Sequence, residues 1–207
     1  MSLRRLHASS AVLIAAFACL HLANHLVATA GVASHIAFMY AARSVYRHRL
    51  VEPLLVASVT IQVVSGLALV VRGWKRRNGF VAWLQACSGA YLSLFLVVHV
   101  GAVLLGRAAL GLDTNFYFAA AGLHVPPFQF FFAPYYFLAV VALFTHLGCA
   151  AYRHTQCRSR ATRGIVLAGP VVLGVIASSL IVLALAGALF PVEIPAEYRA
   201  SYGQTGR

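Results

Sequence analysis

Histidine is the residue type whose placement in this chain points most directly to chemistry. Nine histidines are present, and four of them lie inside long apolar runs: His21, His25, His99 and His146. An ionisable side chain in an apolar membrane segment is a functional candidate by default, because hydrocarbon does not hydrate it. A neutral imidazole is a good ligand for haem iron, and it also donates and accepts hydrogen bonds. These four residues therefore predict either a metal centre or polar contacts within a helical bundle.

The other five histidines fall at the ends of predicted helices or in loops. They are His7, His35, His48, His124 and His154. We expect their side chains to be solvated or to lie at the membrane interface, as polar side chains at such positions usually do.

The composition is that of an integral membrane protein. Of 207 residues, 61% are hydrophobic and only 10% are charged, and the mean hydropathy is +0.84. A soluble domain is about half apolar and about a quarter charged. The net charge of +12 would suit nucleic acid, but the basic residues form short clusters between apolar runs, as topology signals do. The sequence therefore predicts a lipid bilayer as partner and argues against nucleic acid.

Five apolar stretches are long enough to cross a bilayer, which requires about 20 residues in a helix. They lie near 9–30, 52–71, 80–106, 128–152 and 164–190. The predicted fold is all-α, a five-helix transmembrane bundle that forms a single domain over residues 1–207. Pro53 suits the first turn of the second span. Gly174 and Ser178, one turn apart, offer the fifth span a small-residue face for close packing.

Charge asymmetry predicts the orientation of the bundle. The N-terminus and the loops 72–79 and 153–163 carry ten of the sixteen basic residues and no acid, whereas all four acidic residues lie on the opposite side. The positive-inside rule then places the N-terminus in the cytoplasm and the C-terminus outside. The predicted location is a bacterial inner membrane. We expect the aromatic loop 107–127 to form a lid at the outer interface.

Helical rise allows the depths of the histidines to be compared. His25 lies about five residues past the middle of the first span, and His99 about six past the middle of the third, which runs in the same direction. Two imidazoles at one depth on two helices are what bis-histidine ligation of a haem b requires. His25 and His99 are therefore the predicted metal ligands, with His21, one turn from His25, as the alternative on the first span. The competing interpretation is a hydrogen bond to a neighbouring Ser or Gln within the bundle.

His146 is predicted to lie nearer the inner side, about 15 Å in depth from the first pair. The second span contains no histidine to match it, so one haem is favoured over two. His146 is then expected to line a quinone or proton pocket. Gln62, Ser88 and Tyr135 are the further candidates for a quinone site, because such a site needs a few polar groups in an apolar cleft.

Several of these stretches resemble a known family. His25 in the first span, "SGAYLSLFLVVH" at 88–99 and "FTHLGCA" at 144–150 resemble the cytochrome b membrane anchors of succinate dehydrogenases and fumarate reductases, over roughly residues 9–152. The stretch "LDTNFYFAAAGLH" at 112–124 is similar to one in a bacterial five-span branch related to these anchors.

The resemblance implies a function and a ligand set. In the single-chain anchors, five helices hold two haems b through one histidine from each of four helices, and they pass electrons between a quinone and a flavin/iron–sulfur pair. It implies haem ligation by His25 or His21, His99 and His146, while the second span supplies no histidine here. It also implies soluble flavoprotein and iron–sulfur subunits on the cytoplasmic face.

Two functions follow as hypotheses. The first is a membrane b-type cytochrome or anchor subunit that carries electrons between a quinone and a redox partner. The second is a haem-free five-span protein, either a structural or assembly subunit or a small-molecule carrier. No HExxH or GxSxG motif and no carboxylate deep in a span supports a catalytic centre of its own, so at most the chain is a quinone-reactive subunit of an oxidoreductase complex. The sequence leaves homo-oligomers open.

Overall fold

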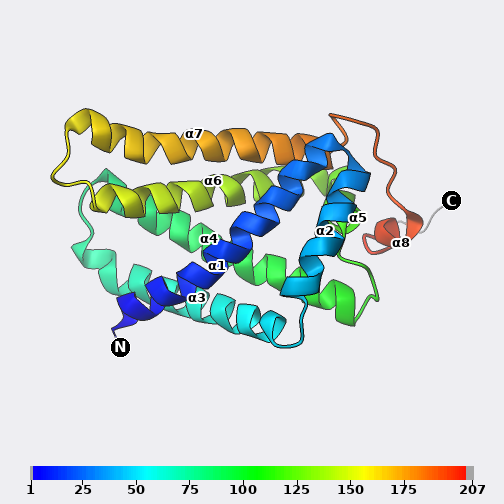
Figure 1. Cartoon of the computed structure of the whole chain (residues 1–207), viewed down its shortest axis with the longest axis horizontal. Coiled ribbons are helices and arrows are strands. Elements are labelled where there is room, and N and C mark those ends of the chain that lie inside the picture. The colour runs from blue at the N-terminus through cyan, green and yellow to red at the C-terminus, as the bar shows by residue number, and fades with distance from the viewer. Residues whose placement is uncertain (1, 204–207) are drawn as a thin grey trace.

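The computed structural model of the chain describes residues 2–203, which form an all-helical bundle with short connections (Figure 1). The helices are α1 (Leu3–Val27), α2 (Val32–Tyr46), α3 (Val51–Gly73), α4 (Phe80–Ala108), α5 (Phe116–His124), α6 (Gln129–Arg153), α7 (Arg160–Leu185) and α8 (Ala196–Ala200). Short 3₁₀ turns follow α1 at Ala28–Ala30 and α3 at Trp74–Arg76.

Five helices are long and apolar enough to cross a membrane: α1, α3, α4, α6 and α7. The prediction of five spans is confirmed. The first helix begins earlier than expected, at Leu3, because the Ser2 hydroxyl caps it by accepting a hydrogen bond from the Arg5 N–H. The last span ends at Leu185 because Gly187 adopts a left-handed φ of 74° there.

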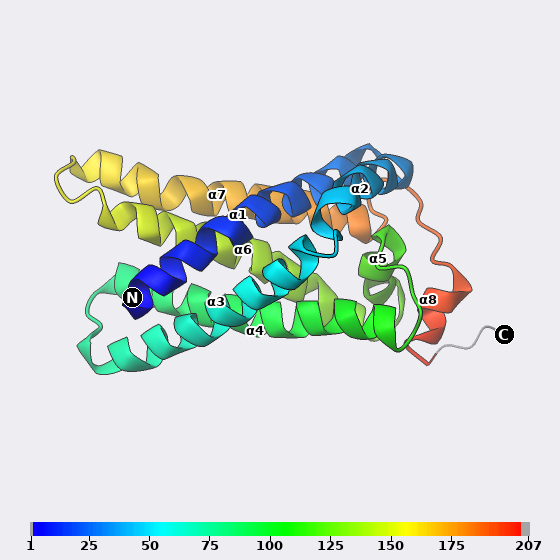
Figure 2. The same cartoon turned by 60° about the horizontal axis from the view of Figure 1, so that its bottom comes forward.

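The long helices run up and down, so the bundle has two distinct ends (Figures 1 and 2). One end holds the N-terminus and the α3–α4 and α6–α7 connections, and we call it the N-terminal end. The other end holds α2, α5 and α8, and we call it the α2/α5 end. The expected loops at 31–51 and 107–127 are therefore largely helical, since α2 and α5 fill them.

Helix α1 crosses the bundle obliquely (Figure 1). It packs on α3 over much of its length and on α2 and α7 near the α2/α5 end. Among residues 2–203, no Cα atom of α1 lies within 8 Å of one in α4 or α6. Directly packed helices have axes about 8–10 Å apart, so only side chains bridge α1 and α4.

Helices α6 and α7, by contrast, pack tightly through small residues. A Cβ atom at Gly174 would lie 2.7 Å from the Cβ of Phe144, and one at Gly148 would lie 3.2 Å from the Leu167 carbonyl oxygen. The fully buried Ser178 hydroxyl donates to the Phe137 carbonyl across the same interface at 2.8 Å. The small-residue face predicted for the fifth span is therefore confirmed.

We predict that Gly174→Ala destabilises the protein by about 1–3 kcal/mol, because the new methyl group overpacks against a Cβ atom that a rotamer change does not move. The matched control is Gly169→Ala on the same helix, where a Cβ has no atom within 4 Å. That control should unfold at or slightly above the wild-type temperature. Thermal unfolding in detergent measures both, and equal midpoints for the two variants would show that the α6–α7 interface is not tight.

Candidate functional site

Four histidine rings from three helices gather between α1, α2 and α4. On α1, the rings of His21 and His25 lie 4.7 Å apart between centroids. The His21 ring lies 5.9 Å from that of His99 on α4, and the His25 ring lies 5.2 Å from that of His35 on α2. The sequence paired His25 with His99, whereas the α1 ring that contacts His99 in the structure is that of His21, the alternative. We call these four residues the histidine cluster.

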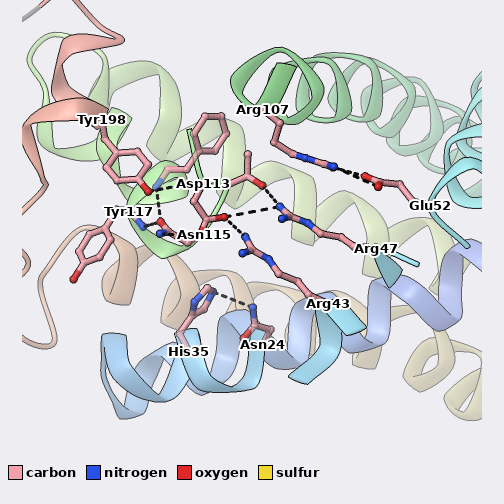
Figure 3. A network of polar contacts seen from close by, with 12 residues as sticks. Asn24, His35, Arg43, Arg47, Glu52, Arg107, Asp113, Asn115, Tyr117 and Tyr198 are labelled. Atoms are coloured by element: carbon pink, nitrogen blue, oxygen red, sulfur yellow. Dashed lines mark hydrogen bonds and ion pairs between the residues drawn. The ribbon is translucent and has the colours of Figure 1, made fainter. Parts of the chain in front are cut away.

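Most of the cluster has no hydrogen-bond partner. Within residues 2–203, the side chains of His21, His25 and His99 make no hydrogen bond, and Nδ1 of His25 is a buried atom without a partner. The amide of Asn24 donates to Nε2 of His35 at 3.1 Å, which leaves Nδ1 of His35 and Oδ1 of Asn24 without partners (Figure 3). Buried polar groups are normally paired, so the two buried nitrogens without a partner, Nδ1 of His25 and Nδ1 of His35, need an explanation.

Aromatic rings flank the two histidines that face each other. Phe95 stacks on His99 with centroids 4.9 Å apart, and Phe17 stacks on His21 at 5.5 Å. Tyr135 of α6 lies against Phe95, with centroids 4.8 Å apart, and its hydroxyl donates to the Phe95 carbonyl. These contacts fix the orientation of the imidazoles and keep the surroundings of His99 apolar.

The expectation that His35 is solvated is wrong, because its side chain is only 2% exposed. The short helix α2 buries one face, formed by His35, Met39 and Arg43 at a spacing of four residues. That spacing is visible in the sequence and is the signal that would have identified α2. Burial, with smaller contributions from His21 and Arg43, lowers the pKa of His35 to about 4.

A second polar cluster lies toward the N-terminal end, between α1 and α3. Nδ1 of His7 lies 2.9 Å from the Ser65 hydroxyl, and the Gln62 amide donates to Nε2 of His7 at 3.1 Å. The Ser10 hydroxyl completes the network by donating to the Gln62 side-chain carbonyl at 2.6 Å. His7 is therefore half-buried and hydrogen-bonded to α3 rather than fully solvated, while its position near the start of α1 agrees with an interfacial side chain.

His146 of α6 contacts α4 at the same end of the bundle. Its Nδ1 donates to the Gln85 carbonyl oxygen at 3.0 Å and lies 3.3 Å from the Ser88 hydroxyl. Gly89 permits this approach, because a Cβ there would lie 2.9 Å from the His146 ring. The hydrogen bond to Gln85 places the proton on Nδ1 and leaves Nε2 as an acceptor.

The seven predicted site residues thus divide between two places. His21, His25 and His99 meet in the histidine cluster, with Tyr135 one ring away. Gln62, Ser88 and His146 lie toward the N-terminal end. Ser88 and His99 are eleven residues apart on α4, or about 16 Å of helical rise, close to the predicted separation in depth. The four quinone candidates therefore do not form one pocket.

Sequence reasoning did not predict the ion pairs at the α2/α5 end (Figure 3). Arg43, 9% exposed, pairs with Asp113 at 2.7 Å, and Arg47 lies 4.0 Å from the same carboxylate. Glu52, at the start of α3, pairs with Arg107, at the end of α4. The ion pairs fasten α2 to the segment before α5 and join the adjoining ends of α3 and α4.

The donor set suits a haem better than a bare metal ion. Within residues 2–203, no group of three or more His, Cys, Asp or Glu side chains is arranged to hold a metal ion. A haem needs only axial protein ligands, because the porphyrin supplies the other donors. The rings of His21 and His99, which meet edge to face without a hydrogen bond in the described residues, are the imidazoles that could hold such a group.

We predict that acid destabilises the protein through His35. Below about pH 6.5 the unfolded chain protonates this histidine, whereas the folded protein does not until about pH 4. The unfolded state therefore binds more protons in this window. As the pH is lowered from about 6.5 to about 4, the free energy of unfolding decreases by up to about 3 kcal/mol. Above pH 6.5 this contribution is constant.

The measurement is the thermal midpoint in detergent between pH 7.5 and pH 4. His35→Gln, whose amide still reaches Asn24, should lose less stability on acidification than the wild type. His154→Gln, at an exposed position, should follow the wild type. Parallel curves for the wild type and His35→Gln would exclude this role for His35.

No family model, curated protein or solved structure matches the chain. The chemistry of the histidine cluster is therefore inferred from its own residues.

Proposed function

We propose that the protein is a membrane b-type cytochrome that carries electrons between a quinone and a redox partner. The observation that carries the proposal is the histidine cluster, in which three imidazoles within the spans have no hydrogen-bond partner. In an apolar interior, an unpaired imidazole costs free energy that ligation to iron would recover. A bound haem b would supply one-electron chemistry at this level of the bundle.

His99 is the proposed ligand from α4, and either His21 or His25 is the ligand from α1. The ring of His21 lies 5.9 Å from that of His99, which favours His21 as the residue that would hold the haem together with His99. The separation of the α1 and α4 backbones also supports a cofactor between them.

The residues around the ligands would set their properties. Stacking on Phe95 and Phe17 holds the rings of His99 and His21. Apolar surroundings exclude water and thereby influence the reduction potential. We propose one haem rather than two, because the ring nitrogens of His7 and His146 already form hydrogen bonds within the bundle.

A quinone would react at the N-terminal end, where His146 and Ser88 present polar groups beside an apolar helix face. The basic connections after α3 and α6 lie at that end, and they would receive a soluble flavoprotein or iron–sulfur partner by charge attraction. In this proposal the N-terminal end faces the cytoplasm of a bacterial inner membrane.

We predict a reduced-minus-oxidised difference spectrum of a b-type cytochrome, with about one haem per chain by pyridine haemochrome. His99→Ala should lose the bound haem. Of His21→Ala and His25→Ala, one should lose the six-coordinate low-spin spectrum, because only one of them is the axial ligand.

The matched controls are His146→Ala and His7→Ala, which should retain the full haem content. A protein that stays colourless after expression with ample haem would favour the haem-free alternative. Haem retained with an unchanged spectrum in His99→Ala would contradict the ligand assignment.

A further inference from the structure

A cavity of about 550 Å³ opens between α3 and α4 at the α2/α5 end. It is lined by Arg49, Glu52, Pro53, Val56, Ala57, Leu104 and Arg107. It is wide open toward the outside of the bundle rather than enclosed. It belongs to neither histidine group, and the proposed function does not use it.

The lining has two chemically different parts. Pro53, Val56 and Ala57 follow one another along one face of the first turns of α3, opposite Leu104 of α4. These residues form an apolar wall that runs from the ends of the two helices into the membrane-spanning part. Charged groups stand only at the mouth, where the Glu52–Arg107 ion pair joins the helix ends (Figure 3).

The mouth has an excess of positive charge. Around it, Arg43, Arg47, Arg49 and Arg107 face only two carboxylates, Asp113 and Glu52. Arg49 is exposed and makes no hydrogen bond or ion pair with any side chain in the described part of the chain. Burial and the positive charges of Arg43 and Arg107 lower the pKa of Arg47, as expected where cations are crowded.

The cavity opens to the outside of the bundle. Pro53, Ala57 and Leu104 are exposed, as are the adjacent Leu54 and Leu105. In a membrane-spanning chain, exposed apolar side chains on α3 and α4 face lipid. The expected ligand therefore enters from the bilayer and carries a negative charge at the helix ends and an apolar chain beside α3.

We propose that this cavity binds an anionic phospholipid, with its phosphate at the guanidinium group of Arg49 beside the Glu52–Arg107 pair and an acyl chain along Val56, Ala57 and Leu104. Guanidinium groups bind phosphate oxygens through paired hydrogen bonds. Basic pockets between membrane helices are suited to anionic headgroups. A free phosphate ion would satisfy the charges at the mouth but would leave the apolar wall without a partner.

The test titrates delipidated protein in detergent with phosphatidylglycerol or with phosphatidylcholine of the same acyl chains, and native mass spectrometry counts the bound lipid. Wild-type protein should bind one phosphatidylglycerol more tightly than phosphatidylcholine. Arg49→Gln should weaken phosphatidylglycerol binding about fivefold, because one guanidinium near a headgroup contributes about that much. Arg72→Gln, at the opposite end of α3, should behave as the wild type.

A second variant tests the apolar part. Ala57→Phe places a large ring in the space along the apolar wall and should weaken the binding of both lipids. The control Ala102→Phe, at an exposed position of α4 outside the cavity, should change the binding of neither lipid. Equal affinities of the wild type for the two lipids would overturn the proposal. So would equal effects of Arg49→Gln and Arg72→Gln, or displacement of phosphatidylglycerol by millimolar inorganic phosphate, which would assign the site to a soluble anion. Haem content enters none of these outcomes, so the result is independent of the proposed cytochrome function.

Discussion

Hydrocarbon offers no hydrogen bonds, and this constraint governs every polar group in the bundle. A helix satisfies its own backbone, but a side chain within a span depends on a neighbouring helix, on water or on a ligand. His7 and His146 meet the constraint through α3 and α4, with partners at 2.9–3.1 Å. His21, His25 and His99 do not. The difference separates the histidines that the fold pairs from those that it leaves without a hydrogen bond in the described residues.

Helix packing also differs between the places where these two groups of histidines lie. Glycine and serine bring α6 and α7 into close contact, and Gly89 lets His146 reach the backbone of α4. Helix α1 instead crosses α4 with no Cα pair within 8 Å in the described residues. Because the rings of His21 and His99 bridge that gap, their positions depend on side-chain contacts such as the stacking of Phe95. The bundle therefore combines a tightly packed helix pair with a more widely spaced one.

The sequence was sufficient for the five spans and for the approach of an α1 histidine to His99, although that histidine is His21, the alternative, because hydropathy and helical rise depend on local residues alone. His35 was missed because α2 is too short to span a membrane, so the four-residue spacing of His35, Met39 and Arg43 lay outside the predicted spans. The hydrogen bonds of His7 to α3 were missed because the first helix begins at Leu3 rather than near residue 9. The pairing of Arg107 with Glu52 joins residues far apart in the chain, and no local pattern indicates such a contact.

Helix α2 connects the charged α2/α5 end to the histidine cluster. His35 and Arg43 lie two turns apart on its buried face. Arg43 is held by Asp113, just before α5, and the Phe116 ring at the start of α5 lies 5.3 Å from that of His35. The Tyr198 hydroxyl donates to the Asp113 carbonyl and so adds α8 to the same group. Arg43 is 9% exposed whereas Asp113 is 35% exposed, so water at the carboxylate weakens the pair without removing the cost of leaving the guanidinium unpaired. Movement of α2 away from α5 would break the Arg43–Asp113 pair, so the pair helps to keep His35 against Asn24 and His25.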